Sequence, residues 1–275
     1  MVQELNKIKI HDEKSFDKMR EAGRLAADCL DYITGFIEPG VSTEEINKLC
    51  HDFQVKRGAT PAPLNYKGFP KSVCTSVNHV VCHGIPGKKI LKNGDIINID
   101  VTPILNGWHG DTSRMFHVGK VSLKAQKLIE TTYEAMMRGI EMAKPGNTTG
   151  DIGNAIQKFA ESKNYSVVRD FCGHGLGEVF HDNPSILHFG NEGDGELLKE
   201  GMFFTVEPMI NIGSFKVKVL SDGWTAVTSD KKLSAQFEHS IGIKNNGPEI
   251  FTLSEINTGV PTDSASIIVI PKFSL

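Results

Sequence analysis

Two amphipathic helices are predicted near the start of the chain, because apolar residues recur there at steps of three and four positions. The first runs over residues 12–36, and Pro39-Gly40 ends its pattern. The second is expected to begin at Ser42, where Ser42 and Glu45 form an SxxE capping box, and to stop near Gly58. The apolar positions of the two helices are Phe16, Met19, Ala22, Leu25, Ala26, Cys29, Leu30, Ile33, Ile46, Leu49, Cys50 and Phe53.

The same arrangement recurs 106 residues later in the chain. A helix is predicted over residues 123–143, Pro145-Gly146 ends it, and Thr148 can cap the helix that follows. The register also holds through that following helix, which favours an internal duplication over coincidence. Its matching apolar positions are Ile152, Ala155, Ile156 and Phe159.

Strand-like segments follow each helical pair, at residues 95–118 in the first half and at 202–213 and 233–243 in the second. Two similar halves of this kind predict an α+β fold, with an antiparallel sheet shared by both halves and helices layered on one face of it. Residues 191–201 are rich in glycine and acidic residues and are predicted to form a surface loop.

No linker rich in proline, glycine or serine separates the two halves, so one domain is expected over residues 1–275. The halves cover roughly 12–120 and 121–255, and the tail 256–275 is left without an assigned role.

Two aspartates stand in the stretch NIDVTPILNGWHGDTSRMF, where strand propensity disfavours them. Asn106-Gly107 is a strong signal for a two-residue hairpin turn, which would pair Thr102 with Asp111 and Asp100 with Ser113. Strand alternation then puts the two aspartates on one face as diagonal neighbours, with Cβ atoms ~7 Å apart. Each face has its own residues: Ile97, Ile99, Val101, Leu105 and Trp108 on one, and Asn98, Asp100, Thr102, His109, Asp111 and Ser113 on the other.

Pro103 complicates this interpretation because proline cannot donate to a strand ladder and marks an edge or a bulge. A shift of one residue in the pairing would separate the two aspartates. The alternative is that both are solvated residues on the outer face of a strand, which is the usual place for an aspartate.

Three further acceptors favour a metal site over that alternative. Glu207 interrupts an apolar strand, and Pro208 after it keeps the backbone extended. Alternation places Glu238 on a polar strand face with Ser234, Gln236 and Ser240, and His174 is flanked by glycines that allow close approach. One imidazole and four carboxylates form a hard donor set that suits two divalent ions such as Mn, Fe or Co. Spacing alone leaves open whether the five residues converge.

Composition and charge are those of an ordinary globular protein. The net charge of −3, with lysine and arginine scattered along the chain, gives no electrostatic reason to expect a nucleic acid or a membrane as the main partner. The cysteines are five, an odd number without CxxC spacing, which favours a reducing compartment. The N-terminus has no apolar leader core, and a cytoplasmic location is expected.

Five motifs in order along the chain closely resemble those of the bacterial kind of type I methionine aminopeptidase. They are VCHGIPG, INIDVTP with GWHGDTSRMF, CGHGLGEVFH, FTVEPMI and LSAQFEHSI, and the resemblance covers roughly residues 12–255. It implies the pita-bread fold, in which two halves related by a pseudo-two-fold axis hold a pair of metal ions between them. The duplication inferred above agrees with that arrangement.

The resemblance also implies roles for individual residues. It makes Asp100, Asp111, His174, Glu207 and Glu238 the metal ligands, with Asp111 and Glu238 bridging the two ions. It makes His83 and His181 the histidines that contact the substrate at the scissile peptide. A lone histidine is more often a surface or core residue, and the motif context reverses that expectation here.

The pocket for the methionine side chain is likewise inferred from the resemblance, as is a weaker site for a monovalent cation. Pro63 stands where some relatives have a cysteine, so the outer rim of the pocket departs from the family pattern. Aromatic and sulfur-bearing walls suit a flexible, polarisable thioether. The pocket residues are Tyr66, Phe69, Cys74, Phe180 and Trp224, and the cation-site residues are Asn78, Val80 and Ser234.

The activity implied by the resemblance is removal of the N-terminal methionine from nascent proteins when the second residue is small, through attack of a metal-bridging hydroxide on the first peptide bond. Glu207 would act as ligand and proton shuttle. A monomer in transient contact with the ribosome is expected. Two rivals are a proline-specific peptidase of the same fold, which usually has a large extra N-terminal domain, and a non-catalytic binding module, which typically lacks some metal ligands.

Overall fold

The first pair of helices begins where the sequence predicts. The structure, a computed structural model, describes residues 7–254 and 256. Helix α1 (Glu13–Thr34) is capped by Asp12, whose side chain accepts a hydrogen bond from the Ser15 N–H. Helix α2 (Thr43–Lys56) begins with the predicted capping box, in which Ser42 and Glu45 bond each other's backbone N–H groups.

The second pair of helices repeats the first. Helix α3 (Leu123–Glu141) is capped by Ser122, and α4 (Thr149–Ser162) begins with a capping box made by Thr148 and Asp151. The predicted cap at Thr148 is therefore confirmed, and the equivalent helices α2 and α4 begin with the same device.

An antiparallel sheet joins the two halves of the chain. Its central pair is β16 against β7, so the strand from the second half lies directly beside the strand from the first. Strand β17 (Gly247–Ile250) pairs with β16 on the same edge as β7, further along the strand, and β11 pairs with the opposite edge. The main path runs in the order β10 (Asp182–Ile186), β9 (Gly173–Gly175), β11 (Phe203–Val206), β16 (Glu238–Lys244), β7 (Thr112–His117), β4 (Ile96–Val101) and β2 (Cys74–Val77).

Three smaller sheets take up the strands that leave this path. All three predicted strand-like segments are divided between sheets: the segment over 95–118 between Val101 and Pro103, the segment over 202–213 between Val206 and Met209, and the segment over 233–243 at Phe237. The small sheets are β1 (Thr60–Pro61) with β5 (Pro103–Leu105) and β6 (Trp108–His109); β15 (Ser234–Gln236) with β12 (Met209–Asn211) and β8 (Ser166–Val167); and β13 (Val217–Val219) with β14 (Ala226–Thr228) and β3 (Val80–Cys82).

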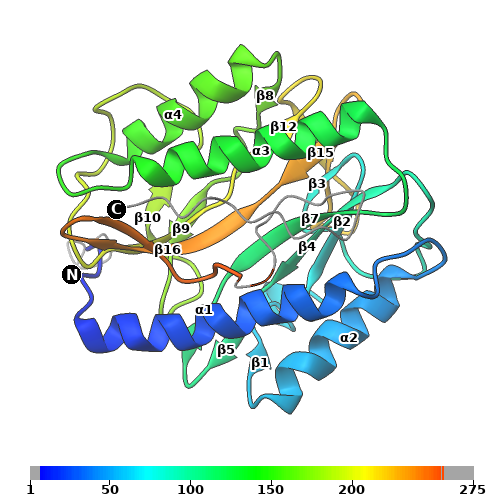
Figure 1. Cartoon of the computed structure of the whole chain (residues 1–275), viewed down its shortest axis with the longest axis horizontal. Helices are drawn as coiled ribbons and strands as arrows, with labels where there is room; N and C mark the ends of the chain where they lie inside the picture. The colour runs from blue at the N-terminus through cyan, green and yellow to red at the C-terminus, as the bar shows by residue number, and fades with distance from the viewer. Residues whose placement is uncertain (1–6, 255, 257–275) are drawn as a thin grey trace.

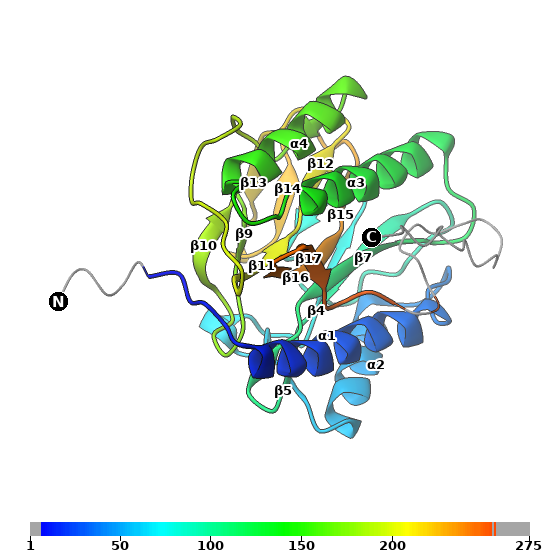
Figure 2. The ribbon, with the colours of Figure 1, turned by 60° about the vertical axis from the view of Figure 1, so that its left-hand side comes forward.

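The helices cover one face of the curled sheet. In Figure 1, α3 and α4 lie along one side and α1 and α2 along the other, with β16 and β7 running between them, and Figure 2 shows the same layers from the side. Ile97, Ile99 and Val101 point from β4 into the core under α1 and α2. The alternate residues of β4 therefore face away from the helices, which is where the polar residues lie.

Two further features concern the rest of the chain. Residues 191–201 form a loop with one isolated bridge between Leu197 and Thr148, as the composition predicted. The tail 256–275 lies outside the described residues except for residue 256. Over the part of the chain that the structure describes, no helix is long and apolar enough to cross a membrane.

Candidate metal and substrate site

The first half brings Asp100 and Asp111 together by the predicted pairing. Asp100 lies opposite Ser113 across β4 and β7, and Leu105 lies opposite Trp108 beside the Asn106-Gly107 turn. Thr102 and Asp111 meet through their side chains, since the Thr102 hydroxyl donates to Asp111 Oδ1 at 2.7 Å. Both aspartates line the same cavity.

Pro103 explains why this hairpin is not one continuous ladder. β4 ends at Val101, and Pro103 starts β5 in a different sheet, so the proline marks the point where the strand leaves the central sheet. Strand alternation placed His109 on the same face as the two aspartates, but after this break His109 does not line the cavity. It stacks on Phe180, and its Nδ1 bonds the Gly177 carbonyl at 2.8 Å.

The second half contributes Glu207 and Glu238 from β11 and β16. Val206 pairs with His239, so Glu207 and Glu238 are next to each other where the two strands begin to separate. Glu207 is held by two side chains: the Thr205 hydroxyl donates to Oε1 at 2.7 Å, and the Gln236 amide donates to Oε2 at 3.3 Å. Both carboxylates point into the cavity that Asp100 and Asp111 line.

His174 on β9 completes the group. Its Nε2 lies 3.7 Å from Asp111 Oδ2 and 3.6 Å from Glu207 Oε1. Its Nδ1 lies 3.1 Å from the Gly175 carbonyl and donates to it, which leaves Nε2 as the nitrogen available to a metal. The backbone N–H of His174 donates to Thr205 Oγ1 at 3.0 Å, so one threonine positions both His174 and Glu207.

These residues form a buried acidic cluster. One ligand atom each from Asp111, His174 and Glu238 lie within 4.8 Å of one another, and the two carboxylates are only 3% and 2% exposed. Burial, followed by repulsion from neighbouring carboxylates, raises the pKa of Asp100 and Glu238 well above the ordinary range, and burial does the same for Glu207. Burial also raises the pKa of Asp111 to about 7.

Divalent cations would remove this electrostatic conflict, and the donor set fits them. Four carboxylates in a buried site repel one another unless positive charge is present. Burial lowers the pKa of His174 to about 4, so its imidazole is neutral and can act as a ligand near pH 7. Oxygen donors with one imidazole nitrogen are suited to transition-metal ions in the Mn to Zn series.

The five predicted metal ligands line a cavity of about 370 Å³. All five residues expected to bind the methionine side chain line this cavity, and so does Pro63. The aromatic side chains contact one another around the cavity. The ring centroids of Phe69 and Trp224 are 5.3 Å apart in an edge-on arrangement, and those of Tyr66 and Phe180 are 4.9 Å apart. The structure thus brings the predicted pocket and the predicted metal ligands into one space.

His83 and His181 line the same cavity from opposite halves of the chain. His83 follows β3 and has a φ of 54°, which is uncommon for a residue other than glycine. The backbone directly after His83 packs tightly against β2. A Cβ on Gly84 would lie 2.1 Å from the Thr75 carbonyl oxygen, so only glycine fits at this position. His181 lies 4.2 Å from the His174 ring and stacks on Tyr66. Desolvation lowers the pKa of both His83 and His181.

Several residues of the site were not assigned from the sequence. Thr102 and Thr205 orient carboxylates, and the pairing argument could have found Thr102 because it placed that residue opposite Asp111. Gln236 had been placed on the polar strand face without a role. The cavity-lining residues to which the sequence analysis gave no role are Lys67, Cys82, Asp170, Phe171, Cys172 and Met209, of which Cys82, Cys172 and Met209 lie within the family motifs.

The three residues expected to bind a monovalent cation lie away from this cavity. The Ser234 N–H donates to the Asn78 carbonyl at 2.9 Å, and Val80 lies opposite Val227. The Ser234 hydroxyl is buried and has no hydrogen-bond partner in the described part of the chain.

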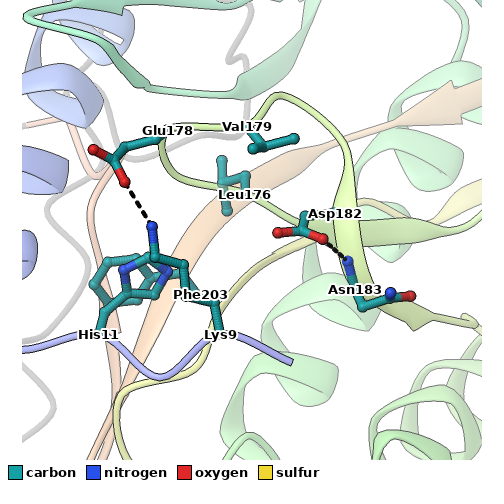
Figure 3. Close-up of a pocket in the computed structure, with 8 residues that line it drawn as sticks. All are labelled: Lys9, His11, Leu176, Glu178, Val179, Asp182, Asn183 and Phe203. Carbon is teal, nitrogen blue, oxygen red and sulfur yellow. Dashed lines mark hydrogen bonds and ion pairs between the residues drawn. The ribbon is translucent and has the colours of Figure 1, made fainter. Parts of the chain in front are cut away.

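A second, much smaller hollow lies beside the loop that carries Phe180 and His181. Figure 3 shows Lys9 reaching Glu178, whose carboxylate it meets at 2.6 Å, and His11 over Phe203. With a volume of about 10 Å³, the hollow has room for about one water molecule. At this hollow the N-terminal segment, through Lys9 and His11, packs against the loop that bears His181.

The comparison with known proteins agrees with this geometry. Residues 17–245 match the model of metallopeptidase family M24. The chain is 65% identical over 249 residues to a methionine aminopeptidase of Rickettsia prowazekii, covering 90% of this chain and 96% of that protein. A crystal structure of methionine aminopeptidase from the same organism superimposes with a TM-score of 0.89 at 64% identity, over 90% of this chain and all of that one.

A more distant solved structure shares the fold alone. The Xaa-Pro dipeptidase from Bacillus anthracis gives a TM-score of 0.71 at 24% identity, and the match covers 89% of this chain but 62% of that one. That protein therefore has a large part with no counterpart in the match.

Proposed function

The chain belongs to metallopeptidase family M24, and from that premise we propose that it is a methionine aminopeptidase, which removes the N-terminal methionine from nascent proteins when the second residue is small. The carrying observation is that four carboxylates, two of them buried and two partly buried, line one cavity together with an imidazole and an aromatic and thiol-bearing wall. The high identity to a methionine aminopeptidase over nearly its whole length supports the same activity.

Asp100, Asp111, His174, Glu207 and Glu238 would hold two divalent ions, and the family resemblance gives Asp111 and Glu238 the bridging role. Four negative charges balance two dications, which supports a pair over a single ion. Mn, Fe and Co are the preferred candidates and Zn is the next. When bound, the ions would supply Lewis acidity toward the scissile carbonyl and lower the pKa of water.

Glu207 is the residue proposed to move protons during hydrolysis. Burial raises its pKa in the metal-free protein, and a carboxylate at this place is a group that can accept a proton and return it. Hydrogen bonds from Thr205 and Gln236 keep both of its oxygens in fixed positions. A proton taken from water could therefore be passed to the leaving amine without a large movement of the side chain.

His83 and His181 are proposed to orient the peptide from two sides of the cavity. Because their lowered pKa values keep both imidazoles neutral near pH 7, each can donate one hydrogen bond and accept another. A donor aimed at the carbonyl oxygen stabilises the negative charge that develops there during attack.

The aromatic and thiol-bearing residues that line the cavity are proposed to hold the methionine side chain. Phe69 and Cys74 are buried, and Trp224 meets both Phe69 and His83 edge-on. Aromatic rings and a thiol around a flexible thioether give favourable sulfur–aromatic contacts. Tyr66 and Phe180 close the cavity next to His181.

A substrate comparison tests this activity against its nearest rival. The metal-free protein is titrated in turn with Mn, Fe, Co and Zn ions, and each form is assayed on Met-Gly-Met and on an Xaa-Pro peptide. Metal-dependent release of methionine from Met-Gly-Met, with Xaa-Pro cleavage at least about a hundredfold slower, is the expected result. Preferential cleavage of the Xaa-Pro peptide would instead identify a proline-specific peptidase.

A non-catalytic binding module is the second rival, and the same experiment addresses it. The complete ligand set argues against loss of catalysis, because a carboxylate cluster buried without a function is costly to retain. Absence of peptidase activity with every metal, in protein that binds those metals, would revive this rival.

The remaining elements of the proposal concern context. The residues are proposed to form one catalytic domain that acts in the cytoplasm as a monomer, with transient ribosome contact while the nascent chain emerges. Asn78, Val80 and Ser234 are proposed to bind a monovalent cation, which the buried, unpaired Ser234 hydroxyl supports. Mass measurement in solution tests whether the protein is a monomer. The potassium dependence of the thermal midpoint tests the monovalent-cation site.

A further inference from the structure

His188 makes a buried contact to the backbone of Glu207. It lies just after β10, is 0% exposed and does not line the substrate cavity. Its Nε2 lies 3.1 Å from the Glu207 nitrogen and accepts a hydrogen bond from that N–H. Because the partner is a backbone donor, Nε2 has to be the unprotonated nitrogen of the ring.

The hydrogen bond from the Glu207 N–H to His188 lies at the point where the strand ladder ends. Glu207 comes immediately after β11 ends, and Pro208 after it has no N–H, so the strand ladder gives way at this point. The N–H of Glu207 is therefore where the backbone that carries the carboxylate can be fixed. His188 occupies that position from a segment 19 residues earlier in the chain.

His188 is in turn fixed to helix α4. A Cβ on Gly153 would lie 2.6 Å from the carbonyl oxygens of Leu187 and Phe189, so glycine lets the segment pack directly on the helix. Asn154 donates to the Gly190 carbonyl at 2.8 Å, and Gln157 accepts from the Gly190 N–H at 3.0 Å. A continuous path of contacts runs from α4 through this segment to Glu207.

The other nitrogen of the ring argues against a role in packing alone. Nδ1 must carry the proton, yet it is buried without a hydrogen-bond partner in the described part of the chain. An apolar side chain of similar size would fill the same space without burying an unpaired donor. The histidine is better explained by the acceptor that its Nε2 presents to Glu207.

We propose that His188 is a positioning residue that, through the Glu207 N–H, holds the Glu207 carboxylate in the orientation needed to bind metal and move a proton. The inference rests on the proposed role of Glu207 in metal binding and hydrolysis. His188 touches neither substrate nor metal, and acts only by fixing the backbone. Groups that orient a metal ligand in this way typically change metal affinity by ~10–100-fold when removed.

Two substitutions separate the acceptor from the volume of the side chain. His188→Met removes the acceptor at similar size, and His188→Gln places a carbonyl oxygen near the position of Nε2. His11→Met is the matched control, because His11 is also a buried imidazole with an unpaired Nδ1, but it packs on Phe203 away from the cavity.

The full-length protein is stripped of metal, and Mn²⁺ binding is measured by isothermal titration calorimetry beside the thermal midpoint, followed by kcat and KM on Met-Gly-Met at saturating Mn²⁺. His188→Met is expected to weaken Mn²⁺ binding ~10-fold or more and to lower kcat with KM nearly unchanged. His188→Gln should recover Mn²⁺ affinity to within ~3-fold of the parent, and His11→Met should leave it within ~2-fold.

The proposal is overturned if folded His188→Met binds Mn²⁺ and turns over substrate like the parent, or if His188→Gln is as impaired as His188→Met. Should His188→Met fail to fold, the double variant Asn154→Ala and Gln157→Ala tests the same path, and parental Mn²⁺ affinity in it would overturn the proposal. A parent that binds Mn²⁺ but leaves Met-Gly-Met intact refutes the proposed function, while the affinity comparison still decides the role of His188.

Discussion

The two halves of the molecule carry their carboxylates on equivalent strands, but only one carboxylate of each half is at an equivalent position. Val101 pairs with Thr112 and Val206 with His239, so residue 102 corresponds to 207, and 111 to 238. The segments IDVTP and FTVEP align in the same register, with Pro103 matching Pro208. Asp111 therefore matches Glu238, whereas Asp100 matches a threonine, Thr205, and Glu207 matches another, Thr102.

Threonine and carboxylate have thus changed places between the halves. In each half the threonine hydroxyl donates to a carboxylate at 2.7 Å, to Asp111 in the first and to Glu207 in the second. The strands next to these positions also carry different residues in the two halves. Cys74 lies beside Asp100 on β2, while His174 occupies the matching place on β9 beside Thr205.

This difference shows how a duplicated frame can give an asymmetric site. The frame supplies paired strands that leave the central sheet at a proline, which opens space for ligands in both halves. The exchange of side chains then puts the imidazole and the longer glutamate on one side only. A proton-moving group needs such asymmetry, because the substrate approaches with a defined direction.

The largest expected effect comes from the two matched positions. Asp111→Asn and Glu238→Gln should each weaken Mn²⁺ binding by more than ~100-fold, because each removes a buried charge that both ions would share. Calorimetric titration of the two full-length variants measures this. Parental affinity in one variant, with loss in the other, would mean that the two positions are not functionally equivalent.

The unmatched carboxylates should separate binding from catalysis. Glu207→Gln is expected to lower kcat by ~10²–10⁴-fold even at saturating Mn²⁺, because the amide cannot carry a proton. Asp100→Asn should weaken Mn²⁺ binding but recover most of its kcat once the metal is saturating. Steady-state kinetics over a Mn²⁺ series distinguishes the two, and equal kcat losses at saturation would remove the distinction drawn between the halves.

The two threonines should differ although their hydrogen bonds have equal length. Thr205→Val is expected to cost ~1–3 kcal/mol of unfolding free energy, because the His174 N–H and the Glu207 carboxylate both lose a partner. Thr102→Val affects Asp111 alone and should cost less. Thr132→Val is the control, because it removes a buried hydroxyl that bonds within α3 and is not part of the site. This variant should leave Mn²⁺ affinity unchanged.

Local chemistry explains which features the sequence predicted. The helix starts at Ser42 and Thr148 and the turn at Asn106-Gly107 depend on residues a few positions apart, and the structure confirms them. The approach of Asp100 to Asp111 followed from the turn as well, since one hairpin fixes their register.

Long-range packing explains what the sequence left open. The meeting of Glu207 and Glu238 with the aspartates depends on β16 lying beside β7, and no local pattern sets that pairing; the family resemblance pointed to it instead. The division of the predicted strand at Phe237 has the same origin, because one part joins β12 and the other β11. His188 had no signal at all, since its role exists only through contact with a distant backbone.

The buried acid in the first half should make the metal-free protein sensitive to pH. Folded Asp111 keeps its proton up to about pH 7, while its ordinary value is 3.8, so its contribution to stability is complete below 3.8 and is lost as the pH rises to about 7. As the pH rises from 3.8 to about 7, the thermal midpoint of Asp111→Asn should therefore increase relative to that of the parent by on the order of 5 °C. Above about pH 7 the difference should not increase further. A difference that stays constant across this range would contradict the buried, protonated state.

The smallest expected effect is at the N-terminal segment. Lys9→Met breaks the ion pair with Glu178, but both side chains are about half exposed and screened by solvent, so the urea midpoint of unfolding should not change measurably. Urea titration measures it, with Lys158→Met as a control for another exposed pair. A large rise in KM for Met-Gly-Met would show that this segment supports the loop of His181 more strongly than its charge pair suggests.

Anomalous diffraction from crystals of the Mn²⁺-loaded full-length protein tests the central claim most directly. Two manganese peaks are predicted among Asp100, Asp111, His174, Glu207 and Glu238, with Asp111 and Glu238 contacting both ions. Manganese located elsewhere in the molecule, or a loaded protein whose peaks avoid these five side chains, would contradict the account.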